Sequence, residues 1–232
     1  MNNHWQELDR YGTGVMMRIG VIHATMNAVQ PLEKAMLQVN SELKLVNFVN
    51  EELLYHANRF HGVDDWGRKT FLNLFTQAVD ADVSAIVIAC SLYSTFADDV
   101  QKFTEKPVIA IDGPMIKEAI ITGKKIGILA TTASAGPTEE RKILDAAQEA
   151  GKTISTQVKI CTEAMDALKS QNEPLHNQLL SEAAAQLEAD GCDCIVLSQI
   201  TMACAKKEMT NITVPVLTSP ESGARYLNHI LV

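Results

Sequence analysis

The amino-acid sequence predicts an α/β protein made of two related domains, each with a four-stranded parallel sheet flanked by helices. Short runs rich in β-branched residues alternate with longer segments of helical periodicity. This alternation is typical of parallel strands joined by crossover helices. Stretches of the sequence also recur at a nearly constant spacing. The first observation predicts the fold class, and the second predicts its division into two similar halves.

Composition and charge exclude several classes of protein. The 232 residues are 47% hydrophobic and 21% charged, which is enough to bury a full core in one to two domains. The net charge of −8, without a long Lys/Arg cluster, argues against nucleic acids and anionic membranes as partners. The longest apolar stretch, Ala85–Cys90, is far shorter than the roughly 18–20 residues of a membrane span.

Eight short apolar runs are the expected strands. Each is about 4–8 residues long, as buried parallel strands are. In chain order they are Arg18–His23, Leu43–Phe48, Ala85–Cys90, Pro107–Ile111, Lys125–Ala130, Gln157–Cys161, Asp193–Ser198 and Val214–Leu217.

Several of the intervening helices have readable ends. Pro31 suits the first turn of one helix, because a first-turn residue needs no intrahelical N–H partner. Thr138 is expected to open a second helix that ends at Gly151, and Pro174 to open a third that ends at Gly191. Each of these segments carries an apolar stripe at helical spacing, so each is expected to pack on a sheet.

Three pairs of expected strands share sequence, in the same order and about 108 residues apart. A period of this length indicates a duplicated domain rather than a solenoid. The matching segments are Ile19–Thr25 with Ile126–Thr132, Ile86–Cys90 with Ile195–Gln199, and Pro107–Ile109 with Pro215–Leu217.

Small polar side chains follow the strands at the ends where parallel sheets bind ligands. Hydroxyl and amide groups dominate, with one thiol, which suits a small carboxylate held by hydroxyls and backbone N–H groups. These strand-end residues are His23, Thr25, Met26, Asn27, Cys90, Ser91, Tyr93, Ser94, Thr131, Thr132, Ser134, Ser198, Gln199 and Thr201. Neither a GxGxxG nor a GxxxxGK[ST] motif is present, so a dinucleotide or P-loop function has no support.

Cys90 is the candidate catalytic residue. It ends an expected strand, and we expect a helix N-terminus close by, whose partial positive charge would lower the pKa of the thiol. A thiolate can take or deliver a proton at carbon. The alternative is that Cys90, like many free cysteines, only packs as a small hydrophobic residue.

The other cysteines and the histidines are expected to be structural. Five cysteines without a CxxC motif fit a reducing cytoplasm and give no structural zinc site. The spacing of Cys192 and Cys194 predicts that both side chains point the same way. We expect His23 to be packed and hydrogen-bonded and His176 to cap a helix. His56 and His61 are expected in the loop Tyr55–Gly62 after the second strand, at an end that could overhang the ligand site, although histidines in such loops are more often simply solvated.

Four segments together resemble the aspartate/glutamate/hydantoin racemase superfamily. They are Ile19–Thr25, IVIACS at Ile86–Ser91, LATTAS at Leu129–Ser134, and IVLSQITMA followed by VPVLTSP in the last forty residues. The resemblance runs from Met17 to Val232. It implies two pseudo-symmetric domains that face each other across a cleft holding the site, no cofactor, no metal, and a homodimer. It also implies two opposed cysteines that exchange a proton at a carbon next to a carboxylate.

The resemblance carries individual roles onto this sequence. Cys90 corresponds to the first catalytic cysteine, with Ser91 beside it to hold the substrate carboxylate. Thr132 resembles the hydroxyl contact of the second domain, and Asn27 or Thr25 that of the first. The second cysteine corresponds to Gln199, which cannot exchange a proton at carbon. The expected substrate-binding set is Thr25, Asn27, Ser91, Thr131, Thr132, Ser198, Gln199 and Thr201.

The leading hypothesis is a cofactor-independent racemase or isomerase-type enzyme with Cys90 as its acid/base. A decarboxylase of an activated malonate-like acid, which needs one cysteine, is the first alternative. A non-catalytic protein that binds a small carboxylate is the second.

We expect a first domain of residues 17–112 plus 211–232, a second domain of residues 113–210, and an N-terminal extension of residues 1–16. The expected location is the cytoplasm, because the N-terminal region lacks the apolar core of a secretory signal.

Overall fold

Two four-stranded parallel sheets form the framework of this computed structural model, which describes residues 17–231. The first sheet has the order β2-β1-β3-β4, and the second has the equivalent order β6-β5-β7-β8. The strands are β1 (Arg18–His23), β2 (Lys44–Val49), β3 (Ala85–Ile88), β4 (Val108–Ala110), β5 (Lys125–Ala130), β6 (Ser155–Ile160), β7 (Cys194–Leu197) and β8 (Val216–Thr218). The predicted fold class is confirmed. The expected extension of residues 1–16 lies outside the described residues.

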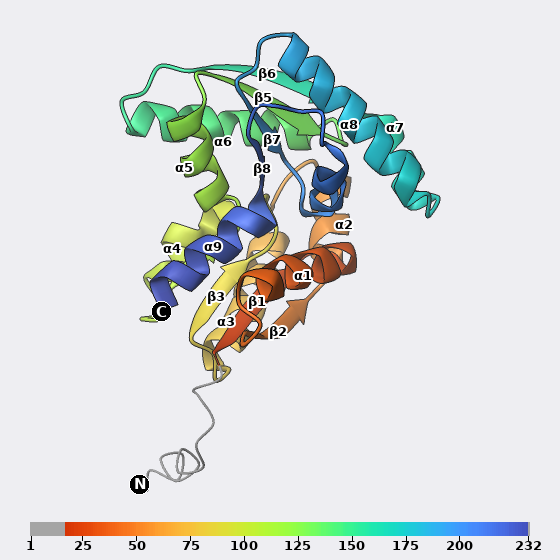
Figure 1. The fold of residues 1–232 in the computed structure, drawn as a ribbon. Helices are drawn as coiled ribbons and strands as arrows, with labels where there is room; N and C mark the ends of the chain where they lie inside the picture. Colours follow the sequence, from red (N-terminus) through yellow and green to blue (C-terminus); the bar gives the residue numbers. More distant parts are fainter. Residues whose placement is uncertain (1–16, 232) are drawn as a thin grey trace, which may run out of the picture.

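Helices connect the strands and cover both sheets (Figure 1). The α-helices are α1 (Val29–Val39), α2 (Glu52–Arg59), α3 (Asp65–Asp80), α4 (Ala97–Gln101), α5 (Gly113–Thr122), α6 (Ala135–Glu149), α7 (Thr162–Lys169), α8 (Glu173–Ala189) and α9 (Ser219–Leu231). Between residues 17 and 231, three 3₁₀ segments complete the connections: η2 (Met26–Ala28), η3 (Ser94–Phe96) and η4 (Ile200–Glu208).

Burial distinguishes the central strands of each sheet from the edge strands. Every residue of β3 and β7 is buried, because helices pack on both faces of each sheet. The edge strands β2 and β6 are only partly buried. All strand pairs are parallel, so the carboxyl ends of β1 and β3 lie together at one edge of the first sheet. The carboxyl ends of β5 and β7 do the same in the second sheet.

The predicted helix ends agree with the structure to within a few residues. Helix α6 begins at Ala135, one turn before the predicted Thr138, with Ser134 preceding it. Gly151 and Gly191 follow α6 and α8 with φ of +63° and +88°. These left-handed conformations favour glycine and stop each helix where predicted.

The prediction that Cys192 and Cys194 point the same way is wrong. Cys192 packs with Leu187 of α8 on one face of the second sheet, and Cys194 packs with Ile126 and Ile128 on the other face. The strict alternation of strand side chains does not reach Cys192, because β7 starts only at Cys194.

The end of the chain divides its contacts between the two domains. Strand β8 pairs with β7 and therefore belongs to the second sheet. Helix α9 returns to the first domain, where Ala224 and Leu227 join the core that contains Ile19 and Met36. The range 211–232 assigned to the first domain thus contains a strand of the second sheet, and only α9 packs on the first domain.

Candidate active site

The Cys90 thiol lies directly beyond the carboxyl end of β3. Residue Ile22 of β1 is in register with Ile88 of β3, and the Ala89 N–H donates to the Ile22 carbonyl at 2.8 Å. The chain then turns, with the N–H groups of Tyr93 and Ser94 donating to the Cys90 carbonyl at 3.0 and 2.8 Å. The Cys90 side chain is half-buried against the first-domain core. We call Cys90–Tyr93 the thiol turn.

The expected lowering of the Cys90 pKa is not what the structure gives. Burial raises the pKa of the Cys90 thiol above its ordinary value. The backbone N–H groups of Tyr93 and Leu92 and the positive charge of Lys142 lower it, but they do not outweigh the loss of solvent. The expected helix N-terminus is also weak, since a 3₁₀ segment of three residues and then the five-residue α4 follow the turn.

The polar candidate residues of the first domain differ in burial and in hydrogen bonding. Ser91 is half-buried next to Cys90. Thr25 is half-buried beyond β1 and accepts the N–H of Asn27 on its hydroxyl at 3.4 Å, which caps η2. Asn27 itself is exposed.

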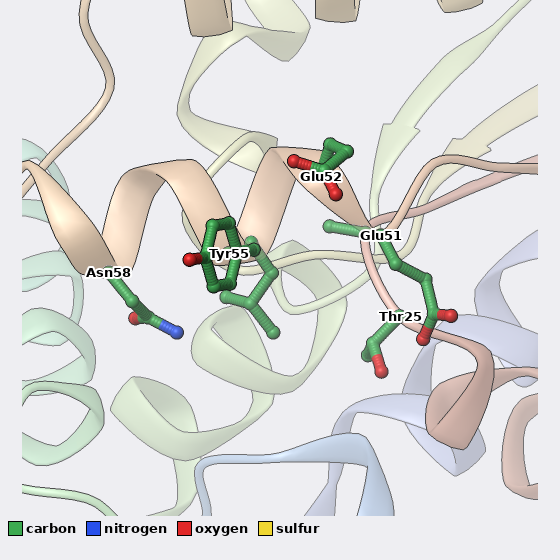
Figure 2. Close-up of a pocket in the computed structure, with 7 residues that line it drawn as sticks. Thr25, Glu51, Glu52, Tyr55 and Asn58 are labelled. Atoms are coloured by element: carbon green, nitrogen blue, oxygen red, sulfur yellow. The ribbon is translucent and has the colours of Figure 1, made fainter.

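A pocket of about 420 Å³ opens beside Thr25. Its lining comes from the end of β1 and from α2, and Figure 2 shows Glu51 next to Thr25, with Tyr55 and Asn58 further along the helix. The Glu51 carboxylate accepts the backbone N–H of Met26 at 3.1 Å. Two carboxylates, Glu51 and Glu52, line this pocket. It therefore favours a positively charged or hydrogen-bond-donating group of a ligand over a ligand carboxylate, which the two glutamates would repel.

In the second domain, Gln199 is fixed by Thr131. The Gln199 Oε1 accepts the Thr131 N–H at 2.7 Å and the Thr131 hydroxyl at 2.8 Å. Because the backbone N–H can only donate, the amide oxygen must face Thr131 and the amide NH₂ must point away from it. Thr131 is buried, so its hydroxyl holds Gln199 and is not exposed to a ligand. Gln199 itself is half-buried.

The other second-domain candidates have different surroundings. Thr132 is half-buried and accepts the Ala135 N–H at 3.3 Å at the start of α6. The buried Ser198 hydroxyl has no hydrogen-bond partner within the described residues. Thr201 is half-buried in η4, and its carbonyl accepts the Cys204 thiol at 3.3 Å.

Two contacts bring the strand ends of the two domains toward each other. The first is a hydrogen bond of 2.5 Å from the Lys142 ammonium of α6 to the Ser91 carbonyl in the thiol turn. The second is the packing of η4, which starts directly after Gln199, against η2 and α1. Ile200 of η4 joins the first-domain core beside Ala28 and Leu32.

Sequence reasoning missed a group of buried ionisable side chains beside the thiol turn. Asp112, before α5, pairs with Lys142 at 2.5 Å, and Glu139 lies one helical turn before Lys142. Glu139 is 1% exposed, and its pKa is raised to about 8 by burial and by the charge of Asp112. Asp112 and Glu51 both lie beyond carboxyl strand ends, so inspecting β2 and β4 as well as the central strands would have found them. Lys142 and Glu139 lie within helix α6 and not at a strand end, so their position in the sequence does not mark them as site residues.

The histidine predictions are correct in part. His23 is buried and its Nε2 lies 3.0 Å from the Asn47 Oδ1, and burial lowers its pKa. His176 is not a cap: it is buried, with Nδ1 2.7 Å from the Ala164 carbonyl of α7. His56 is not in a loop either, since it lies on α2 and stacks on Trp66. His61 follows α2 with a φ of 56°.

Two further features bear on the chemistry available here. Within residues 17–231, no three His, Cys, Asp or Glu side chains form a group that could hold a metal ion. None of the helices in this part of the chain has the length and apolar character needed to cross a membrane. The groups available for chemistry near the strand ends are the Cys90 thiol, the hydroxyls of Ser91 and Thr132, the Gln199 amide and the buried Lys142–Asp112 ion pair.

Comparisons with known proteins agree with this architecture. The profile of the Asp/Glu/Hydantoin racemase family matches residues 19–227. A search of curated protein sequences finds no significant match.

Solved structures of several racemases share the fold. An aspartate racemase homologue from Pyrococcus horikoshii OT3 is 19% identical, with a TM-score of 0.68 over 93% of this chain and 99% of that one. The allantoin racemase from Klebsiella pneumoniae is 15% identical, with a TM-score of 0.67 over 93% and 87% of the two chains. A glutamate racemase isoform from Bacillus anthracis is 16% identical, with a TM-score of 0.64 over 93% and 81%.

The family profile spans nearly the whole of the described chain, from β1 into α9, and includes the thiol turn and Gln199. The chain therefore belongs to the Asp/Glu/hydantoin racemase family.

Proposed function

We propose that this protein is a cofactor-independent isomerase-type enzyme that exchanges a proton at a carbon next to a carboxylate, with Cys90 as its acid/base. The observation that carries this proposal is the half-buried Cys90 thiol at the carboxyl end of β3, in a chain whose family profile is that of racemases. The names of the structural neighbours suggest aspartate and glutamate as the first carboxylates to test. Allantoin, whose reacting carbon lies next to an amide carbonyl instead of a carboxylate, tests whether the same exchange extends to that group.

In the proposed step, the Cys90 thiolate removes the proton from the carbon next to the carboxylate. The C–H electron pair moves into the carboxylate as an enolate, and the thiolate becomes a thiol. The thiol then exchanges its proton with solvent, and transfer of a proton from the thiol back to carbon restores the thiolate and the C–H bond. The hydroxyls of Ser91 and Thr132 and the amide NH₂ of Gln199 are the groups proposed to stabilise the enolate charge.

The neutral amide of Gln199 is unsuited to serve as a second acid/base. Proton exchange at the face that Cys90 serves is therefore expected to be faster than inversion. Because burial raises the pKa of Cys90, exchange is expected to keep rising with pH up to and beyond the ordinary thiol value of 9.0.

The test is hydrogen exchange in D₂O with each enantiomer of aspartate, glutamate and allantoin. Loss of the α-proton signal is followed by NMR, and configuration by chiral chromatography. Cys90→Ala is expected to slow exchange about 10²–10⁴-fold. Cys204→Ala, which removes another half-buried thiol, is the control and is expected to exchange at the wild-type rate.

Exchange at the wild-type rate in Cys90→Ala would overturn the proposed mechanism. The comparisons with known proteins favour neither the decarboxylase nor the non-catalytic binder. The same protein samples can be used to test both alternatives. Release of CO₂ from an activated malonate without α-exchange would indicate the decarboxylase. Thermal stabilisation by a carboxylate without any exchange would indicate the non-catalytic binder.

The same proposal includes the homodimer, the cytoplasmic location and the substrate-binding set, in which Thr131 acts by holding Gln199. The family relationship supports a small-molecule substrate. Light scattering after size-exclusion chromatography tests the dimer, which is expected to have twice the 25.4 kDa mass of the chain.

A further inference from the structure

The buried ammonium of Lys142, on α6 of the second domain, has three hydrogen-bond acceptors, and all three belong to residues that follow strands of the first domain. It donates to the Ser91 carbonyl at 2.5 Å, to the Ser94 hydroxyl at 2.9 Å and to the Asp112 carboxylate at 2.5 Å. An ammonium has three N–H donors, so this set satisfies it completely. The side chains of Lys142 and Asp112 are only 13% and 5% exposed.

These acceptors belong to the thiol turn and to its immediate support. Ser91 is the residue after Cys90, and its carbonyl is part of the turn backbone. The Ser94 hydroxyl lies 3.0 Å from that carbonyl and 3.2 Å from Asp112, and can donate to one of them at a time. Asp112 precedes α5, the helix that leads from the first sheet to the second. The ammonium therefore connects α6 of the second domain to the backbone that carries the thiol.

We propose that Lys142 is a positioning residue for Cys90: from the second domain it holds the thiol turn through the Ser91 carbonyl, with Asp112 as its counter-ion. This inference rests on the proposed function, in which Cys90 is the acid/base. A thiol displaced by about 1 Å from its substrate carbon can lose about 10²-fold in rate, so a fixed turn has catalytic value.

A merely structural ion pair would have different consequences. Buried ion pairs often add little net stability, and replacing both partners by neutral groups is frequently neutral. If Lys142 and Asp112 only neutralised each other, neutralising both would restore a normal enzyme. If Lys142 holds the turn, activity is expected to stay low after both charges are removed.

The titratable groups around this contact are Lys142 and Glu139 on α6, Asp112 before α5, and Cys90 and Tyr93 in the turn. Lys142 lowers the pKa of Cys90 and Asp112 raises it. Removing Lys142 alone is therefore expected to move thiol alkylation to higher pH. Removing both charges is expected to return the alkylation profile toward that of the wild type.

The experiment compares Lys142→Met, Lys142→Arg, and the double variant Lys142→Met with Asp112→Asn. Arg141→Met, an exposed neighbour on the same helix, is the matched control. Two readouts are taken: kcat and KM for α-exchange of whichever of aspartate, glutamate or allantoin the wild type exchanges, and the pH profile of iodoacetamide labelling of Cys90. Peptide mass spectrometry quantifies that labelling against Cys204 in the same sample.

Lys142→Met is expected to lower kcat about 10²-fold with KM changed less than about threefold. Lys142→Arg is expected to recover part of that loss. The double variant is expected to keep a kcat at least about tenfold below wild type while its Cys90 alkylation profile returns toward wild type. If Lys142→Met leaves an unpaired buried Asp112 and does not fold, the double variant still decides the question.

A double variant with wild-type kcat would overturn the positioning role, as would a Lys142→Met variant in which only KM changes. If the wild type exchanges none of the three compounds, the proposed function fails, and the limiting rate of Cys90 alkylation at high pH, where the thiol is fully ionised, decides the inference. A limiting rate that is identical in the wild type and the double variant would then overturn it, because a displaced turn changes the access of the reagent to the thiolate.

Discussion

Gln199 occupies the position in the second domain that Cys90 occupies in the first, but only Cys90 has a side chain that can take up and release a proton. Cys90 has a titratable thiol at the end of β3, whereas Gln199 has a neutral amide whose oxygen is held by Thr131. The sequence repeat identified this correspondence, because Ile86–Cys90 and Ile195–Gln199 align. The orientation of the amide could not be predicted, since it depends on Thr131, 68 residues earlier in the chain.

A thiol at residue 199 is expected to give the enzyme its second acid/base. Gln199→Cys is predicted to raise the rate of inversion about 10²-fold, because a group on the opposite face can return the proton there. Chiral chromatography of the product measures this rate. Gln199→Asn, which brings no thiol, is the control and should show no increase. An unchanged inversion rate in Gln199→Cys would mean that residue 199 does not lie opposite Cys90.

Glu139 is expected to make folding stability depend on pH. Its pKa of about 8 in the folded protein lies above the ordinary carboxyl value of 4.5, so between these pH values the folded state holds a proton that the unfolded state has lost. The free energy of unfolding is therefore predicted to fall as pH rises from about 4.5 to about 8, and to level off above. Glu139→Gln should remove this decline, as measured by urea denaturation across the same range.

Glu149→Gln provides the comparison for that experiment, because Glu149 is exposed at the end of the same helix. It should leave the pH dependence as in the wild type. A wild-type curve that is flat between pH 5 and 8 would contradict the raised pKa of Glu139.

At the scale of elements, α6 depends on a close approach to the second sheet. A Cβ atom at Gly136 would lie 2.6 Å from Val158 Cγ1 and 3.4 Å from Ala130 Cβ. Glycine at this position therefore allows the first turn of α6 to pack directly on β5 and β6. The same helix contains Glu139 and Lys142, so the position in which α6 packs on the sheet also determines where these two side chains lie.

Gly136→Ala is predicted to destabilise the protein by about 1–3 kcal/mol, because the added methyl group overpacks the contact with Val158. Chemical denaturation measures the loss. The double variant Gly136→Ala with Val158→Ala removes the clashing methyl group and should be less destabilised than the two single changes added together. Strict additivity would show that the contact with Val158 is not the cause.

Most elements were predictable from their own residues. Arg18–His23 and Lys125–Ala130 agree with the structure residue for residue, because each is a buried central strand whose side chains are nearly all apolar. The failures are local in origin. His56 is predicted in a loop because α2 has only eight residues. The spacing of Cys192 and Cys194 suggests a common direction only if both lie in a strand, and β7 begins at Cys194.

At the scale of the whole molecule, α9 completes the first domain from the far end of the chain (Figure 1). Its residue Leu227 is fully buried among residues of β1, α1 and the segment after β4. Leu227→Ala is predicted to cost about 2–5 kcal/mol, as large-to-small changes in a core do. Tyr226→Ala, on the exposed side of α9, should cost much less.

Amide hydrogen exchange by mass spectrometry locates the effect of Leu227→Ala. Faster exchange is expected in β1 and β3 than in β5 and β7, because the cavity lies in the first-domain core. Equal acceleration in both sheets would mean that the two domains unfold as one unit.

The sequence by itself determined the parallel α/β fold, the duplication, and the placement of Cys90, Ser91, Thr132 and Gln199 at strand ends. These features follow from the period of apolar residues and from the rule that ligands bind at carboxyl strand ends, both of which are local. Only the tertiary structure decided the electrostatics of the thiol and the contact of Lys142 with its turn. Both depend on burial and on groups distant in the chain, and neither burial nor long-range proximity leaves a periodic trace in a single sequence.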